Sequence, residues 1–224
     1  MGAFSTRPGS ERISDKEEIE RIIPALRAIR KEFPNIPISI DTFRQSVAAQ
    51  CIAEGADIIN DISGGLFDEE MLPYIGKNHI PYILMHITGT LEGMHHEEII
   101  SEDVHSKIQQ FFENQLNKLL EYGKQQIILD PGIGFNKTIE CNFVLLRDLD
   151  KYRVNGLPIL IGISRKSLIY KTLGFTPQEA LNGTTVLNTI ALMNGADILR
   201  VHDVKEAVEA VRLTQAVISS ETKS

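Results

Sequence analysis

Six polar or basic side chains follow apolar runs along this 224-residue chain, and their types could bind two ends of one ligand. Hydrogen-bond acceptors form the first group: Asp41, Asn60 and Asp130. A carboxylate can accept two parallel hydrogen bonds, so this group suits an uncharged heterocycle that offers several N–H donors. Basic side chains form the second group: Lys166, Arg200 and His202, with Arg165 beside Lys166. This group suits a phosphorylated or otherwise anionic substrate.

Pairing within the protein is the simpler explanation for any one of these residues, because a buried cation and a carboxylate can satisfy each other. A polar residue closes every one of the apolar runs, however, with His86 closing the third, and a shared binding site explains that recurrence better. The net charge of −7 supports a local cationic patch, since the protein as a whole does not attract anions. It also argues against a nucleic-acid surface or an acidic membrane surface.

The apolar runs that precede these residues are predicted to be strands, at 36–43, 56–65, 80–89, 125–135, 159–164 and 196–204. Helical patterns separate them, and the clearest cover 14–33, 44–55, 71–77, 103–122, 143–152, 184–195 and 205–219. Regular alternation of strand and helix is typical of a parallel sheet. No linker or change in composition interrupts the pattern, so we expect one domain over residues 1–224.

The spacing of the strands favours a closed barrel. The mean spacing of the strand-end residues from Asp41 to His202 is about 32 residues. This matches a TIM barrel, in which roughly 250 residues are divided over eight units. A doubly wound open sheet would gather its ligand residues at one switch point, whereas here every strand end carries a polar group. We therefore predict a TIM (β/α)8 barrel, of which strands 3 to 8 are recognisable. Two more strands and a helix are expected before the first residue.

The cysteines and the hydropathy bear on the compartment. Cys51 and Cys141 have neither metal-type nor CxxC spacing, and both are expected to be buried or half-buried thiols in a reducing compartment. No apolar run approaches the roughly 18 residues of a membrane span, and no secretory signal opens the sequence. We expect a cytoplasmic protein. His95 and His96 lack a third metal ligand at a useful spacing, and His105 is expected on a helix surface.

Seven motifs together resemble dihydropteroate synthase, the pterin-binding TIM-barrel family: STRPG at 5–9, PISIDT at 37–42, DIINDISGG at 57–65, LMH at 84–86, LDPGIGFNKT at 129–138, GISRKS at 162–167 and RVHDV at 200–204. They occur in the family's order and spacing, from Ser5 to about the last helix. The resemblance implies a transferase of folate biosynthesis. It would join 6-hydroxymethyl-7,8-dihydropterin diphosphate to 4-aminobenzoate, releasing diphosphate and 7,8-dihydropteroate.

The resemblance also implies roles for individual residues. The pterin would be bound by Asp41, Asn60, Met85, Asp130, Phe135 and Lys166. The diphosphate would be bound by Thr6, Arg7, Arg200 and His202. The 4-aminobenzoate would lie beside Pro8, Lys166 and Ser167. Catalysis would rest on Lys166, Arg200, His202 and Arg7. Of these, Arg200, His202 and Arg7 would stabilise the departing diphosphate, and no protein nucleophile is required.

Mg²⁺ is the cofactor that the resemblance implies, and a homodimer is the assembly. The family's first strand carries an asparagine that engages the metal and the diphosphate. That strand and most of the second are expected to lie before the first residue, so we expect no metal ligand in this chain and leave the activity of the short chain open.

Two other functions fit parts of the same pattern. A pterin-binding methyltransferase domain, moving a methyl group from methyltetrahydrofolate to a corrinoid, would share the acidic and amide pterin contacts. It would not need SRKS and RVHD for a diphosphate. A non-catalytic pterin-binding fragment is the second alternative, and an assay with the diphosphate substrate separates all three.

Overall fold

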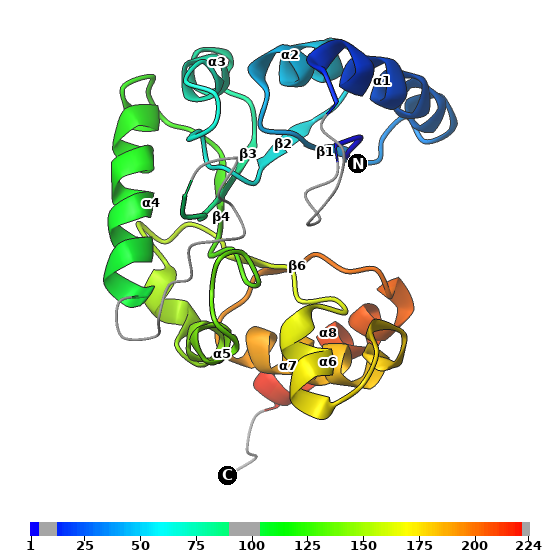
Figure 1. The fold of residues 1–224 in the computed structure, drawn as a ribbon, viewed down its shortest axis with the longest axis vertical. Helices are drawn as coiled ribbons and strands as arrows, with labels where there is room; N and C mark the ends of the chain where they lie inside the picture. Colours follow the sequence, from blue (N-terminus) through cyan, green and yellow to red (C-terminus); the bar gives the residue numbers. More distant parts are fainter. Residues whose placement is uncertain (5–12, 90–103, 221–224) are drawn as a thin grey trace. The chain divides into compact units, whose positions relative to one another are not determined.

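The computed structural model describes residues 1–4, 13–89 and 104–220, in which strands and helices alternate (Figure 1). The strands are β1 Ser39–Asp41, β2 Ile58–Asp61, β3 Tyr82–Met85, β4 Ile127–Asp130, β5 Leu160–Ile161 and β6 Ile198–Leu199. The α-helices are α1 Asp15–Glu32, α2 Gln45–Ala53, α3 Met71–Asn78, α4 Val104–Leu120, α5 Ile139–Arg147, α6 Ser167–Leu173, α7 Leu181–Met193 and α8 Val204–Ile218. Two 3₁₀ turns are also described, η2 Leu149–Tyr152 and η3 Pro177–Glu179.

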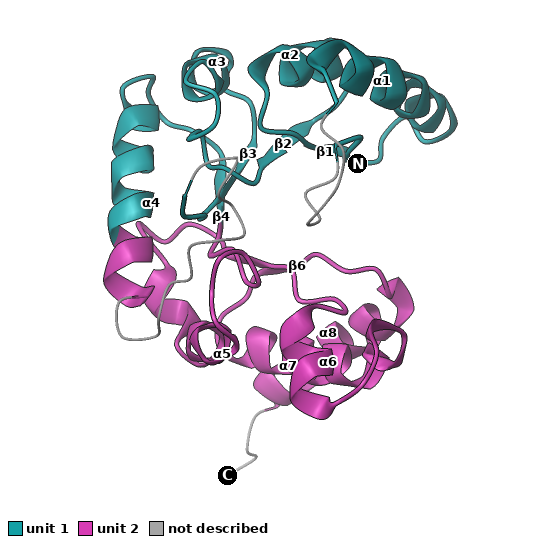
Figure 2. Cartoon of the chain, viewed as in Figure 1, with its two compact units in different colours: residues 1–95, 110–129 teal, residues 96–109, 130–224 magenta. Residues whose placement is uncertain are grey.

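The strands form two sheets, one with the order β1-β2-β3-β4 and one that pairs β5 with β6. The pairings whose register is described are parallel. The chain divides into two compact units (Figure 2): unit 1 comprises residues 1–95 and 110–129, and unit 2 comprises residues 96–109 and 130–224. Each unit is described separately below.

In unit 1, α1 packs beside α2 and α2 beside α3 (Figure 1). The Ser14 side chain caps α1 by accepting a hydrogen bond from the Glu17 N–H at 3.2 Å. The helix buries an apolar stripe at a spacing of three and four residues, Ile22, Ile23 and Leu26. The Met1 carbonyl accepts a hydrogen bond from the Asp41 N–H, so the first residue lies alongside β1.

In unit 2, α7 packs beside α8, and α5 and α6 pack beside α7. The strands β5 and β6 have only two paired residues each, yet Ile159, Leu160 and Ile161 are fully or almost fully buried. Burial of apolar side chains, rather than a long hydrogen-bond ladder, therefore holds this part of the sheet.

All six predicted strands are confirmed, although the observed ladders are shorter than the apolar runs. The structure adds α6, which the sequence did not predict because its seven residues show too little periodicity. The helix predicted at 143–152 is α5 followed by η2, and it begins earlier because Thr138 caps it. Cys51 in α2 and Cys141 in α5 are both free and buried, as predicted.

Candidate active site

The register of unit 1 brings the first two predicted acceptors together. Asp41 and Asn60 are direct neighbours across the parallel ladder of β1 and β2. The Asn60 amide Nδ2 donates a hydrogen bond to the Asp41 Oδ1 at 2.7 Å. Asn60 is 5% exposed whereas Asp41 is exposed, so the pair presents a carboxylate at the carboxyl end of the strands.

Asp61, next to Asn60, is a buried carboxylate that the sequence analysis did not select. It accepts hydrogen bonds from the Ser63 N–H and hydroxyl, both at 2.7 Å, and from the Gly65 N–H at 2.8 Å. The Tyr82 hydroxyl donates a fourth at 2.7 Å. Burial raises the pKa of Asp61, and these donors oppose the shift. Asp61 therefore fixes the turn that follows β2.

At the end of β3, Met85 is fully buried and His86 is 2% exposed. The His86 ring lies edge-on to Phe111 of α4, with the centroids 5.1 Å apart. Sequence reasoning placed Met85 against a flat ligand ring, with core packing as the alternative. Its full burial by protein atoms agrees with packing in the core, and its contact with a ligand stays a prediction.

Unit 2 brings the third acceptor and a cation together. Asp130, the last residue of β4, is 2% exposed at its side chain, and its Oδ1 accepts a hydrogen bond from the Gly132 N–H at 2.8 Å. Its Oδ2 pairs with the Arg200 Nη2 at 2.9 Å. This is the internal cation–carboxylate pairing considered above as the simpler explanation, although the Arg200 side chain keeps 39% of its surface exposed.

Lys166 lies over the loop that follows β4. Its Nζ donates a hydrogen bond to the Ile133 carbonyl and lies 4.7 Å from the centre of the Phe135 ring. Gly134 makes room for this approach, because a Cβ there would lie 3.0 Å from the Lys166 Cδ, and its φ of +81° disfavours other residues. The predicted pterin residues Lys166 and Phe135 are therefore in contact, by a cation–π interaction.

Lys137 is a second lysine at this loop, and sequence reasoning did not select it. It is buried, with 7% exposed, and its Nζ donates hydrogen bonds to the Gly132 carbonyl at 2.9 Å and the Phe135 carbonyl at 3.1 Å. Burial lowers the pKa of Lys137 to about 7; Cys141 and Asp130 oppose this shift, and Lys166 adds to it. The loop is thus folded around the Lys137 amino group.

Arg165 was expected in the cationic patch, and the structure shows that this expectation was wrong. Its guanidinium forms a bidentate pair with Asp203, at 3.0 Å and 2.9 Å, and also donates to the Pro177 and Gln178 carbonyls. The hydrogen bonds with Asp203 raise the pKa of Arg165, and the residue has a φ of +54°. Arg165 therefore connects the end of β5 to the start of α8 rather than facing a ligand.

Of the remaining predicted residues, His202 and Ser167 are described by the structure. His202 is exposed, and its N–H donates a hydrogen bond to the Ser164 Oγ at 3.2 Å. Ser167 begins α6, directly after Lys166, which occupies the N-cap position. Thr6, Arg7 and Pro8 lie outside the described residues, as do His95 and His96, so their roles stay predictions.

His105 differs from the expectation of a plain surface residue. Its ring nitrogen Nδ1 and the buried Tyr152 hydroxyl share a hydrogen bond of 2.7 Å, and its Nε2 lies 3.2 Å from Asp148. The rings of His105 and Tyr152 are stacked, with centroids 5.2 Å apart. Since Tyr152 is fully buried, these contacts tie α4 to η2 and leave no reactive hydroxyl exposed.

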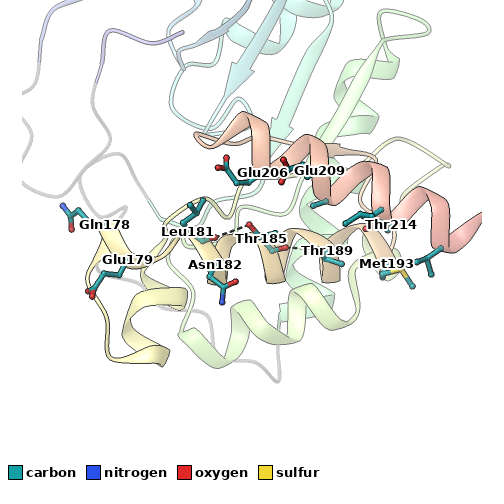
Figure 3. Close-up of a pocket in the computed structure, with 13 residues that line it drawn as sticks. Gln178, Glu179, Leu181, Asn182, Thr185, Thr189, Met193, Glu206, Glu209 and Thr214 are labelled. Atoms are coloured by element: carbon teal, nitrogen blue, oxygen red, sulfur yellow. Dashed lines mark hydrogen bonds between the residues drawn. The ribbon is translucent and has the colours of Figure 1, made fainter.

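A groove in unit 2 lies between α7 and α8 and is lined by none of the predicted site residues (Figure 3). Its volume is about 840 Å³, and its walls include Leu181, Thr185, Met193, Leu213 and Val217.

Within residues 1–4, 13–89 and 104–220, no group of three or more His, Cys, Asp or Glu side chains is placed to hold a metal ion. The helices of that part of the chain include none that is long and apolar enough to span a membrane.

Comparison with known proteins first defines a class: residues 1–202 match the family model described as pterin binding enzyme. A dihydropteroate synthase of Synechocystis is 45% identical over 220 residues, covering 97% of this chain and 75% of the relative. The Escherichia coli K12 dihydropteroate synthase is 39% identical over 222 residues, covering 98% of this chain and 78% of the relative. The chain belongs to the dihydropteroate synthase family.

Solved structures agree with this assignment. A Clostridium difficile dihydropteroate synthase, crystallised in the presence of pteroic acid, is 36% identical with a TM-score of 0.89, covering 98% of this chain and 81% of that one. The Yersinia pestis enzyme in a sulfonamide complex is 36% identical with a TM-score of 0.90, covering 98% and 79%. With its alternating helices and parallel strands, the chain has the α/β fold of the TIM-barrel class, as predicted.

Proposed function

We propose that this chain catalyses the dihydropteroate synthase reaction, joining 6-hydroxymethyl-7,8-dihydropterin diphosphate to 4-aminobenzoate. The observation that carries the proposal is the 45% identity over 97% of the chain to a named dihydropteroate synthase, together with the strand-end acceptors and cations described above. The relatives favour this function over methyl transfer to a corrinoid.

Recognition of the pterin is assigned to the strand-end acceptors, as the resemblance implies. Asp41, Asn60 and Asp130 would accept hydrogen bonds from the pterin's amino-pyrimidine edge and ring nitrogens. Lys166 would donate to the carbonyl side of the pterin, and Met85 and Phe135 would pack on its ring. The partial exposure of Phe135, beside the Lys166 ammonium, supports this assignment.

Departure of the diphosphate is the step that the cations would assist. The bond between the pterin methylene carbon and the diphosphate oxygen breaks, and the oxygen keeps the electron pair. Arg200 and His202, with Thr6 and Arg7, would stabilise the negative charge that develops there. The amine of 4-aminobenzoate, beside Lys166, Ser167 and Pro8, then bonds to the methylene carbon and loses a proton.

Mg²⁺ is proposed from the resemblance alone, as an ion that accompanies the diphosphate oxygens. In the part of the chain that the structure describes, no cluster of acidic, histidine or cysteine side chains fits the metal, so no step is assigned to it here. Adding EDTA to the assay, and then restoring Mg²⁺, tests this. Full activity in EDTA would contradict the proposal.

A homodimer is proposed on the surface formed by α7 and α8. Large apolar side chains on these helices are at least 40% exposed: Val186, Ile190, Met193, Val204, Val208, Leu213, Val217 and Ile218. Such a density of exposed apolar groups marks an interface, and the groove of Figure 3 runs within it. A second copy of the same chain would cover this face.

Light scattering after gel filtration tests the dimer. Leu213→Asp places a charge in the proposed interface and is expected to give monomers. Phe33→Asp is the matched control, because Phe33 is also exposed, at 54%, but belongs to unit 1. Equal masses for wild type and Leu213→Asp would contradict this interface.

A cytoplasmic location is proposed because both cysteines are free and buried, as in a reducing compartment. Fractionation of the native cells, with antibody detection, would test it. Recovery in a secreted or membrane fraction would contradict it.

The activity itself is tested by the release of diphosphate from the pterin substrate. Release is expected to require 4-aminobenzoate and to match dihydropteroate formation mole for mole. Pterin binding without any release of diphosphate would instead identify a non-catalytic binding protein, and methyl transfer from methyltetrahydrofolate would identify the other alternative.

A further inference from the structure

Asp130 and Arg200 are assigned to different parts of the substrate, yet in the structure they bind each other. The proposed function, on which this inference rests, gives Asp130 to the pterin and Arg200 to the diphosphate. The Arg200 Nη2 lies 2.9 Å from the Asp130 Oδ2. A pterin N–H group at this oxygen and a phosphate oxygen at this nitrogen would each compete with the existing ion pair.

The two partners of this ion pair differ in their exposure to solvent. Asp130 is 2% exposed, and its other oxygen is held by the Gly132 N–H at 2.8 Å. Arg200 lies flat against Gly162 of the neighbouring chain segment, where a Cβ would be 3.0 Å from Nη2 and 3.1 Å from Nε. Its side chain is nevertheless 39% exposed. The carboxylate is therefore the buried partner, and the guanidinium is the partner that a ligand can reach.

We propose that Asp130 is a specificity-determining residue, which withholds Arg200 from phosphate oxygens until a pterin occupies the carboxylate. Pterin N–H groups replace the guanidinium at the Asp130 Oδ2, and Arg200 then binds the diphosphate. Free diphosphate brings no donor for Asp130, so it must break the ion pair without replacing it. The site thereby favours the intact pterin diphosphate over diphosphate alone.

The same pairing acts after the reaction. When the pterin product leaves, Asp130 regains Arg200, and the affinity for the remaining diphosphate falls. Coupling between two ligands is reciprocal, so diphosphate must also strengthen the binding of a pterin.

A matched pair in unit 2 provides the control. Asp203 binds Arg165 at 2.9 Å, the same distance as the Asp130 pair. The Arg165 guanidinium also donates to the carbonyls of Pro177 and Gln178, so removing its carboxylate does not release it. Asp203→Asn and Asp130→Asn remove one negative charge each, and only the second weakens the hold on Arg200.

The experiment is calorimetry of inorganic diphosphate with the full chain, with and without 6-hydroxymethylpterin. In the wild type, saturating pterin is expected to tighten diphosphate binding about tenfold. Asp130→Asn is expected to bind diphosphate about tenfold more tightly than wild type without pterin, and to lose the effect of pterin. Asp203→Asn is expected to stay within about twofold of wild type. Asp130→Asn combined with Arg200→Gln is expected to show no gain.

Several outcomes would overturn the inference. Diphosphate affinity that is unchanged or lower in Asp130→Asn would mean that Arg200 serves both groups at once. An equal gain in Asp203→Asn would mean that the effect is one of general charge. If Asp130→Asn does not fold, the pterin effect in the wild type decides alone. If the wild-type chain binds both ligands but without coupling between them, this inference alone is refuted. If it binds neither ligand, the proposed function is refuted as well.

Discussion

The strand-end residues of unit 1 lie within the sheet ladder, whereas most of those in unit 2 lie on loops beyond it. Asp41 and Asn60 are paired strand neighbours, and the backbone register alone places their side chains side by side. In unit 2, Lys166 and Arg200 follow strands of two paired residues. Their positions depend on bonds from side chains to the Ile133 carbonyl and to Asp130.

This difference teaches where a substitution should act. A position set by the ladder is supported by many backbone hydrogen bonds, so the loss of one side chain moves little. Where the contacts of a single ammonium or guanidinium group set the position of a side chain, replacing that group is expected to change the position. Unit 2 is therefore expected to couple side-chain changes to activity more strongly than unit 1.

The largest expected effect is on catalysis, from Arg200→Gln. Loss of the charge that stabilises the leaving diphosphate should lower kcat/KM by about 10²–10³-fold. Arg153→Gln is the matched control, since Arg153 is a partly buried arginine of the same unit that pairs with Asp197. It should lower stability while leaving kcat/KM within about twofold. Similar losses of kcat/KM in both variants would show that unit 2 responds to any arginine loss.

A smaller effect is expected on the stability of unit 1, from Asp61→Asn. The amide has one acceptor oxygen for four donors, so we expect a loss of about 2–3 kcal/mol in the free energy of unfolding. Asp41→Asn, on the exposed strand end, should cost less than about 1 kcal/mol. Urea unfolding measures both, and equal costs would contradict the role given to Asp61.

The smallest of the three effects depends on pH and sharpens the description of unit 2. The pKa of Lys137 is about 7 in the folded chain, below its ordinary value of 10.5. Between these two values the unfolded chain binds a proton that the folded chain does not, so this group makes stability rise with pH.

Lys137→Met removes this dependence together with two hydrogen bonds to carbonyls. At pH 9 it should cost about 2 kcal/mol relative to wild type, and the difference should shrink toward pH 6. Urea unfolding at several pH values measures the difference. A constant difference would mean that Lys137 keeps an ordinary pKa.

Sequence reasoning succeeded where local pattern and strand pairing decide the structure. Alternating apolar runs located all six strands, and the rule that parallel strands share a carboxyl edge predicted that Asp41 and Asn60 would lie together. The buried thiols of Cys51 and Cys141 followed from their spacing and from the helices that carry them.

It failed where the conformation of a loop or a contact between distant residues decides. The partners of Lys137 are the Gly132 and Phe135 carbonyls, five and two residues before it, and the sequence does not show that the loop folds back on the lysine. Arg165 and Lys166 are adjacent and alike in charge, yet Asp203, 38 residues further on, binds only Arg165. The sequence therefore predicted which edge of the sheet carries the candidate site. The structure was needed to distinguish the side chains available to a ligand from those that bind within the protein.

The two buried cysteines have a practical consequence, because each unit contains one. Cys51 lies in unit 1 and Cys141 in unit 2, and both are 0% exposed. Burial raises the pKa of Cys51 to about 11 and also raises that of Cys141, so neither thiol reacts readily while its helix stays packed. Alkylation by iodoacetamide thus reports local opening. The native chain thus carries its own pair of chemical probes, one in α2 of unit 1 and one in α5 of unit 2.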